Sequence, residues 1–255
     1  MKKILVLVVF VVIVIINCTI IAFSATGRQP NNHMTWYEDS HFPVIINSIN
    51  NFEKTERLYT KHNPYADHYY KVYKNGKWGL VYKSRAIEWK QIPEKIYQFT
   101  ECIYDDIQIA AEKSSGDLFL VSQNNKYGFI KPVWDDVKFK IYYSKVMYDN
   151  VTTLLDDCYG KILLNGKYAI YNYRFDTLSE FKYDDVEYVY GVVCAVIINS
   201  KKGLFDAYKN KEYTDIIYDD FRAVNVRMGN FETGAKKATI EGKINGMWKK
   251  IRDSF

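Results

Sequence analysis

Asn75-Gly76-Lys77-Trp78-Gly79 is the stretch from which the expected fold follows. Asn-Gly is the preferred pair for a two-residue type I′ turn, because both central residues need positive φ. A loop of that length fixes the register of a hairpin, so Tyr73 faces Trp78 and Val72 faces Gly79. Tyr73 and Trp78 then form a stabilising cross-strand aromatic pair. Gly79 lies on the other face, where we expect an adjacent repeat to approach the bare backbone.

The same phrase, here the hairpin motif, returns three times with substitutions at the turn and at the aromatic place. Its later copies begin at Asn124, Asn165 and Asn199, and the last carries Lys202 at the aromatic place. A degenerate fifth copy lies within 237–251, where either Glu241-Gly242 or Asn245-Gly246 would form the turn. Terminal repeats are often atypical because they cap an array.

A second phrase, the Tyr-Asp motif, alternates with the hairpins. It recurs at intervals of 44, 35 and 35 residues, beginning at Tyr104, Tyr148, Tyr183 and Tyr218. Such periods indicate a repeat architecture. Asp favours turns by bonding nearby amides, and the apolar residue that follows begins another strand. We therefore expect an all-β chain of tandem antiparallel hairpin repeats, each made of one strand and one hairpin. A β-solenoid-like array is the first choice and a β-propeller the alternative.

These two motifs resemble those of the bacterial WG-repeat proteins, also described as KWG repeats. The resemblance covers about residues 69–251 and is closest in the first hairpin motif. It implies an exported or surface-associated binding protein, recognised by its repeats rather than by an active site. The abundance of Tyr, 23 residues, agrees with β structure, since its ring suits a pleated, half-buried surface.

The N-terminus is expected to direct export. Residues 1–24 combine two lysines with a long apolar stretch, as in a signal peptide or a membrane anchor. Cleavage after Ser24, retention in the membrane and lipidation at Cys18 all stay open. Each of them makes the protein periplasmic, membrane-anchored or exposed at the cell surface. Any membrane contact is expected only through this segment.

Three regions are expected along the chain: residues 1–24, an N-terminal segment over 25–68, and the repeat domain over 69–255. Within the second, residues 25–41 have the composition of a polar tether. The apolar spacing after Pro43 predicts a short helix over about 44–59.

Charge and cysteine content exclude several classes. The net charge of +5 comes without the run of Lys or Arg that marks nucleic-acid binding. No Cys-x-x-Cys spacing occurs, which argues against a zinc site. Cys102, Cys158 and Cys194 are expected either as buried thiols or as one disulfide with one free thiol.

No residue pattern specifies a reaction. All four histidines precede the first hairpin, and His62 and His68 are expected to be solvated rather than to bind a metal. The acidic pairs raise calcium binding and glycoside hydrolysis as alternatives to turn capping. Repetition favours turn capping, since catalysis needs one special pair and not many equivalent ones. The acidic pairs are Asp105-Asp106, Asp135-Asp136, Asp156-Asp157, Asp184-Asp185 and Asp219-Asp220. We assign no catalytic residue, metal ligand or cofactor.

The aromatic residues do not identify the ligand. Trp78, Tyr127 and Tyr168 are expected in the core of their hairpins, while Tyr69-Tyr70 or Tyr142-Tyr143 would supply an exposed binding face. The sequence thus predicts a non-enzymatic binding or interaction scaffold of the bacterial cell envelope. Its partner would be an envelope protein or a cell-wall polysaccharide, and not a nucleic acid. The alternative is a glycan-binding protein or a hydrolase that uses the repeated acidic and aromatic residues.

Overall fold

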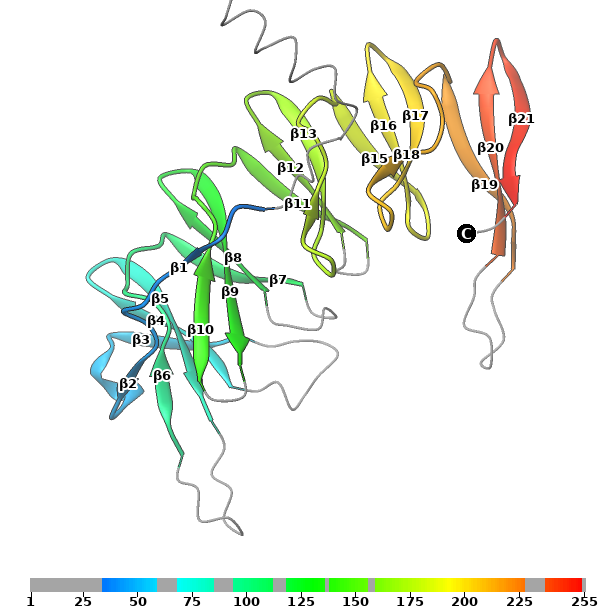
Figure 1. Ribbon diagram of the computed structural model, residues 1–255. Coiled ribbons are helices and arrows are strands. Elements are labelled where there is room, and N and C mark those ends of the chain that lie inside the picture. Colours follow the sequence, from blue (N-terminus) through cyan, green and yellow to red (C-terminus); the bar gives the residue numbers. More distant parts are fainter. Residues whose placement is uncertain are drawn as a thin grey trace, which may run out of the picture. The chain divides into compact units, whose positions relative to one another are not determined.

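The computed structural model describes residues 34–58, 68–84, 94–111, 118–135, 138–155, 159–227 and 237–253. In this part the chain is all-β and forms five antiparallel sheets, and apart from β1 (Tyr37–Glu38) their strands follow one another in sequence order (Figure 1). The one helical element described is a single 3-10 turn, η1 (Ile49–Asn51). The described residues contain no helix with the length and hydropathy needed to cross a membrane.

The expected hairpin register is confirmed. β4 (Tyr69–Lys74) and β5 (Lys77–Lys83) pair so that Tyr73 lies opposite Trp78 and Val72 opposite Gly79. Asn75 and Gly76 have φ of 53° and 81°, as a type I′ turn requires. The centroids of the Tyr73 and Trp78 rings are 5.0 Å apart, so the two side chains are in contact.

Four further hairpins repeat this geometry. We number five units by their hairpins: unit 1 is β4–β5, and units 2 to 5 are β8 (Leu118–Gln123) with β9 (Lys126–Trp134), β12 (Tyr159–Leu164) with β13 (Lys167–Asn172), β16 (Val193–Ile198) with β17 (Lys201–Asp206), and β20 (Lys237–Ile244) with β21 (Met247–Asp253). In unit 5 the turn is Asn245-Gly246, with φ of 52° and 79°. Gly242 instead lies within β20 and admits the Tyr218 ring, which a Cβ atom there would meet at 2.6 Å.

A strand precedes each hairpin, as the Tyr-Asp motif predicts. It begins at the third residue of the Tyr-Asp motif or of its equivalent in unit 1. These strands are β3 (Lys54–Arg57), β7 (Asp106–Ala111), β11 (Asn150–Leu155), β15 (Asp185–Tyr190) and β19 (Asp220–Arg227). The expected unit of three strands is incomplete, however, because units 1 to 4 have a fourth strand after the hairpin: β6 (Ile96–Gln98), β10 (Phe139–Tyr143), β14 (Thr177–Leu178) and β18 (Lys211–Glu212). Most of these strands are too short for alternation to reveal them.

The predicted helix over about 44–59 is wrong. Its described part forms β2 (Val44–Ile46), η1 and β3. The Glu53 amide donates to the Tyr73 carbonyl at 2.9 Å, as the Asp105 amide does to the Ser122 carbonyl at 2.8 Å. Phe52-Glu53 therefore takes the place of Tyr-Asp in unit 1, and the repeat region starts before residue 69. Pairing of β2 with β6 and of β3 with β4 outweighs the helix-like apolar spacing.

Of the tether predicted over 25–41, residues 25–33 lie outside the described ranges, and residues 34–41 pack against the repeats. Residues 34–43, here the N-terminal strap, lie along units 3, 2 and 1. Met34 is buried in the core between units 2 and 3, and the Trp36 Nε1–H donates to Asp176 at 2.5 Å. β1 (Tyr37–Glu38) then pairs with β10 at the edge of the second sheet (Figure 1). The apolar side chains at 34 and 36 explain this docking, because a mainly polar composition does not stop single residues from packing.

The core is divided between neighbouring units. One cluster joins units 1 and 2 through residues such as Leu80 and Phe119, and another joins units 2 and 3 through Phe129 and Ile162. Two more join units 3 to 4 and 4 to 5. Each unit therefore depends on its neighbours to bury its apolar side chains, as in repeat proteins generally.

Candidate functional site

The first acidic residue of each Tyr-Asp motif connects two hairpins. One Asp184 oxygen accepts from Lys167 Nζ at 2.5 Å, and the other accepts from the Asn199 amide at 2.7 Å. Lys167 belongs to the hairpin before, and Asn199 opens the turn of the hairpin after. We call this pair of contacts, one to a lysine and one to a turn amide, a clasp. Asp105 makes it between Lys77 and Asn124, Asp149 between Lys126 and Asn165, and Asp219 between Lys201 and Asn245.

The clasps hold these carboxylates ionised. A hydrogen bond from the paired lysine lowers the pKa of Asp105, Asp149, Asp184 and Asp219, and the backbone amide of the following turn adds to the effect. A general acid would need a raised pKa instead. The expected turn capping is confirmed for the first residue of three acidic pairs, Asp105, Asp184 and Asp219, and each of them also binds a lysine of the preceding hairpin.

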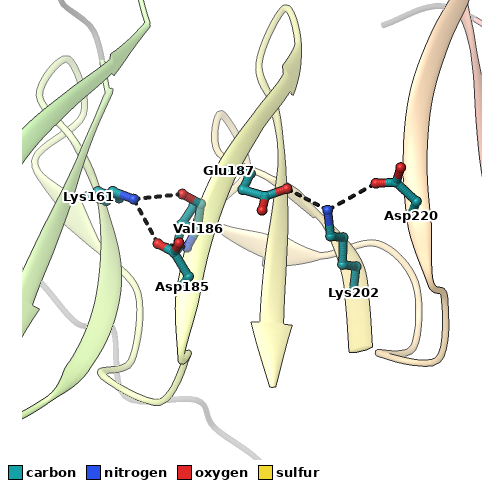
Figure 2. Close-up of polar contacts among 6 residues, drawn as sticks. All are labelled: Lys161, Asp185, Val186, Glu187, Lys202 and Asp220. Atoms are coloured by element: carbon teal, nitrogen blue, oxygen red, sulfur yellow. Dashed lines mark hydrogen bonds and ion pairs between the residues drawn. The ribbon is translucent and has the colours of Figure 1, made fainter. Parts of the chain in front are cut away.

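The second acidic residue anchors a lysine between neighbouring units. Lys161 Nζ of unit 3 lies 2.7 Å from Asp185 and 3.2 Å from the Val186 carbonyl (Figure 2). It also lies 4.9 Å from the centre of the Tyr168 ring. In unit 4, Lys202 replaces the ring. Its ammonium lies 2.6 Å from Glu187 and 3.0 Å from Asp220, so a cation still links units 4 and 5 (Figure 2).

The segment that leads into units 2 to 5 carries a hydroxyl residue that the sequence reasoning missed. Ser144 Oγ accepts from the Phe129 amide at 2.8 Å and donates to the Lys145 carbonyl. Equivalent hydroxyls accept from Leu80, Ile170 and Leu204: Thr100, Ser179 and Thr214. Each stands four residues before the Tyr of the Tyr-Asp motif, a constant spacing that could have identified it.

The glycines of the hairpin motif admit this same connecting segment. A Cβ atom at Gly79 would meet the Glu101 carbonyl at 3.1 Å, and one at Gly128 would meet the Lys145 carbonyl at 3.0 Å. At Gly203 it would meet Ile216 at 2.8 Å. The expected close approach of a neighbouring backbone is therefore confirmed, and the approaching backbone is the segment that leads into the next unit.

The predicted aromatic sites are largely occupied by the protein itself. Trp78, Tyr127 and Tyr168 are partly buried against the core clusters. Lys71 lies 4.5 Å from the centre of the Trp78 ring. Of the two proposed pairs, Tyr69 is buried, and the Tyr143 hydroxyl donates to the Phe99 carbonyl at 2.6 Å.

Other candidate residues are accounted for where the structure describes them. Asp135 caps a turn by accepting from the Lys138 amide at 3.0 Å. Cys102 and Cys194 are free thiols, and burial raises the pKa of Cys194 to about 12. No group of three or more His, Cys, Asp or Glu in the described ranges could hold a metal ion. Several residues lie outside those ranges: Cys18, His33, His62, Asp136, Asp156, Asp157 and Cys158.

A groove of about 770 Å³ lies between the N-terminal strap and the segment that leads into unit 2. We call it the strap groove. Its walls come from three parts of the chain, namely the strap with β2, the connecting segment and β10: Asp39, His41, Phe42, Val44, Thr100, Glu101, Ile103, Tyr104 and Tyr143. A smaller hollow of about 420 Å³ shares Glu101 with it and is lined mainly by polar residues.

The strap groove is lined by hydroxyl groups and carboxylates as well as apolar side chains. Burial, together with the Asp39 charge, raises the pKa of Tyr104 to about 12, and the pKa of Tyr143 is raised for the same reasons. Both phenols stay protonated near neutral pH, and the Tyr143 hydroxyl donates to the Phe99 carbonyl. The Thr100 hydroxyl already accepts from Leu80 and donates to the Glu101 carbonyl, so it is not placed as a nucleophile. No family model and no curated protein matches this chain.

Proposed function

We propose that this chain is an exported, non-enzymatic binding scaffold of the bacterial cell envelope, built from WG-type repeats. One observation carries the proposal: the repeated carboxylates occupy equivalent junctions between hairpins, each with its own lysine. A hydrolase would need two carboxylates that converge on one substrate bond. Residues committed to holding neighbouring units together leave the grooves and loops between them for binding.

We further propose that the units form a linear, solenoid-like array. Each buried cluster of the described residues joins consecutive units. In a propeller the first and last blades would share a core as well, so this pattern favours the linear alternative. An array of this kind suits a partner at the envelope, either a protein or a cell-wall polysaccharide.

Location and activity can be tested together with the full chain carrying a C-terminal tag. In a bacterial host, protease added to spheroplasts should remove the tag, and protection of the tag would contradict export. Purified full chain should co-sediment with isolated envelope and should release no soluble fragments from peptidoglycan above the buffer level. Release that disappears in an Asp184→Asn variant, with envelope binding retained, would instead establish the hydrolase.

The same sedimentation separates the two classes of partner. Envelope stripped of protein retains polysaccharide, so binding that survives stripping indicates a glycan ligand. Binding that is lost on stripping indicates a protein ligand.

A further inference from the structure

Three equivalent tyrosines of the Tyr-Asp motif are buried, and two of them use their hydroxyls within the protein. The Tyr148 hydroxyl donates to Met34 Sδ at 2.8 Å, and the Tyr183 hydroxyl donates to Glu212 at 2.8 Å. Tyr104 is only 4% exposed, yet its hydroxyl has no hydrogen-bond partner among the described residues. Because Tyr104 lines the strap groove, this free hydroxyl is a donor and acceptor for a ligand.

The strap groove is also anionic. Across the described surface most carboxylates form ion pairs with lysine or arginine. The Asp39 carboxylate instead pairs, within the described residues, only with His41, whose Nδ1 lies 2.9 Å away. The Glu101 side chain has neither an ion pair nor a hydrogen bond within the described residues. No lysine or arginine lines the groove. A cationic group that enters the groove can therefore pair with these carboxylates without breaking an ion pair to lysine or arginine.

Apolar side chains stand beside these carboxylates. Val44 and Ile103 line the groove and are 45% and 41% exposed, and the adjacent Ile45 is 60% exposed. Covering such side chains with an apolar ligand group is favourable, because it removes apolar surface from water. β1 and β2 are the outer strands of their sheets, so each has one edge without a strand partner in the described part. Such edges accept extended chains by main-chain hydrogen bonding.

We propose that the strap groove binds a short extended peptide segment in which a lysine or arginine lies next to an apolar residue. The cation meets Asp39 and Glu101, the apolar neighbour covers Val44 and Ile103, and the Tyr104 hydroxyl accepts from the cation. This ligand class rests on the proposed binding function and makes it specific. Because ionic contacts at an exposed groove are screened, binding weakens as salt is added.

The test uses the purified full chain and three fluorescein-labelled hexapeptides read by fluorescence anisotropy. Ser-Leu-Lys-Val-Lys-Ser should bind saturably. Its versions with Glu in place of Lys, or Ser in place of Leu and Val, should bind about tenfold more weakly or not at all. Equal binding of the three peptides, or no binding of the first, would overturn the proposal.

Variants locate the binding. Ile103→Ser, Glu101→Lys and Tyr104→Phe should each weaken binding of Ser-Leu-Lys-Val-Lys-Ser, the first two by about tenfold. Met147 is the matched control, because it stands in the same place in the next unit, is 39% exposed and does not line the groove. Met147→Ser should leave binding unchanged, and a loss equal to that of Ile103→Ser would refute the assignment. If the protein binds isolated envelope but none of the peptides, this ligand class is wrong, whereas the proposed scaffold function is not contradicted.

Discussion

Replacing Ser144 by alanine should destabilise the protein through one orphaned amide. Ser144 is 6% exposed, and its hydroxyl accepts from the amide of Phe129, which is fully buried. Alanine leaves that buried N–H without its acceptor. A buried donor without a partner costs about 1–3 kcal/mol. For a chain of this size the loss corresponds to a fall in Tm of about 2–12 °C.

Urea unfolding of the full chain, followed by far-UV circular dichroism and by tryptophan fluorescence, measures this difference. Hydrogen exchange provides a local readout, because the Phe129 amide should exchange faster in Ser144→Ala than its neighbours on β9. Thermal unfolding provides an independent value of the destabilisation.

Two further variants separate the hydroxyl from the rest of the side chain. Ser144→Thr should retain wild-type stability to within about 0.5 kcal/mol, since Thr100 and Thr214 make the same bond in their units. Ser84→Ala removes a hydroxyl whose bond to the Lys95 amide is exposed, and should cost far less. The reasoning is refuted if Ser144→Ala unfolds with the wild type, or if Ser144→Thr is as unstable as Ser144→Ala.

Three other perturbations follow from the same junctions. Gly128→Val should cost about 1–3 kcal/mol in thermal unfolding, because its Cβ would press on the Lys145 carbonyl, and unchanged stability would contradict the close approach. Gly246→Ala, with φ of 79° and no atom within 4 Å, should cost about 1 kcal/mol through backbone strain alone, so a larger loss of urea stability would indicate a contact that the structure lacks. Stability should be full above about pH 4 and should fall below it, because the clasped carboxylates keep a lowered pKa when folded and the unfolded chain takes up protons first. A urea midpoint equal at about pH 6 and about pH 3 would refute a stabilising role for these carboxylates: Asp105, Asp149, Asp184 and Asp219.

The hairpins were predictable because their information is local. Asn-Gly fixes the turn, the turn fixes the register, and the register alone places Tyr73 against Trp78. The start of the repeat region was not predictable in the same way. Phe52-Glu53 replaces Tyr-Asp, and the residues around it have a spacing that also suits a helix. Only pairing with strands distant in sequence, such as Arg57 with Tyr70 of β4 and Val44 with Gln98 of β6, decides in favour of strands.

The clasps and the strap groove show what a single sequence leaves out. Turn capping by Asp184 could be predicted from its type, but its lysine and its amide belong to different hairpins. The groove combines Asp39, Ile103 and Tyr143, which lie far apart in sequence and carry no common pattern. Docking of the strap creates it, and that docking depends on two apolar residues, Met34 and Trp36, within a polar segment.

Unit 5 shows which residues serve the neighbouring unit rather than their own hairpin. In units 1 to 4 the residue after the turn is a lysine that pairs with the next Asp, and the second residue after that lysine is small. Where this small residue is a glycine, in units 1, 2 and 4, it admits the connecting segment. Unit 5 has Met247 and Lys249 at these places, both exposed, and β21 has no further strand beside it in the described part. Its turn keeps Asn245-Gly246 with positive φ, and its aromatic place keeps Trp248, whose ring contacts Arg222 of the preceding strand. The hairpin motif therefore combines two functions: Asn-Gly and the aromatic ring build the hairpin, while the lysine and the glycine join it to the next one. A lysine at the glycine place also discourages edge pairing, since charged side chains on an outer strand oppose the approach of another chain.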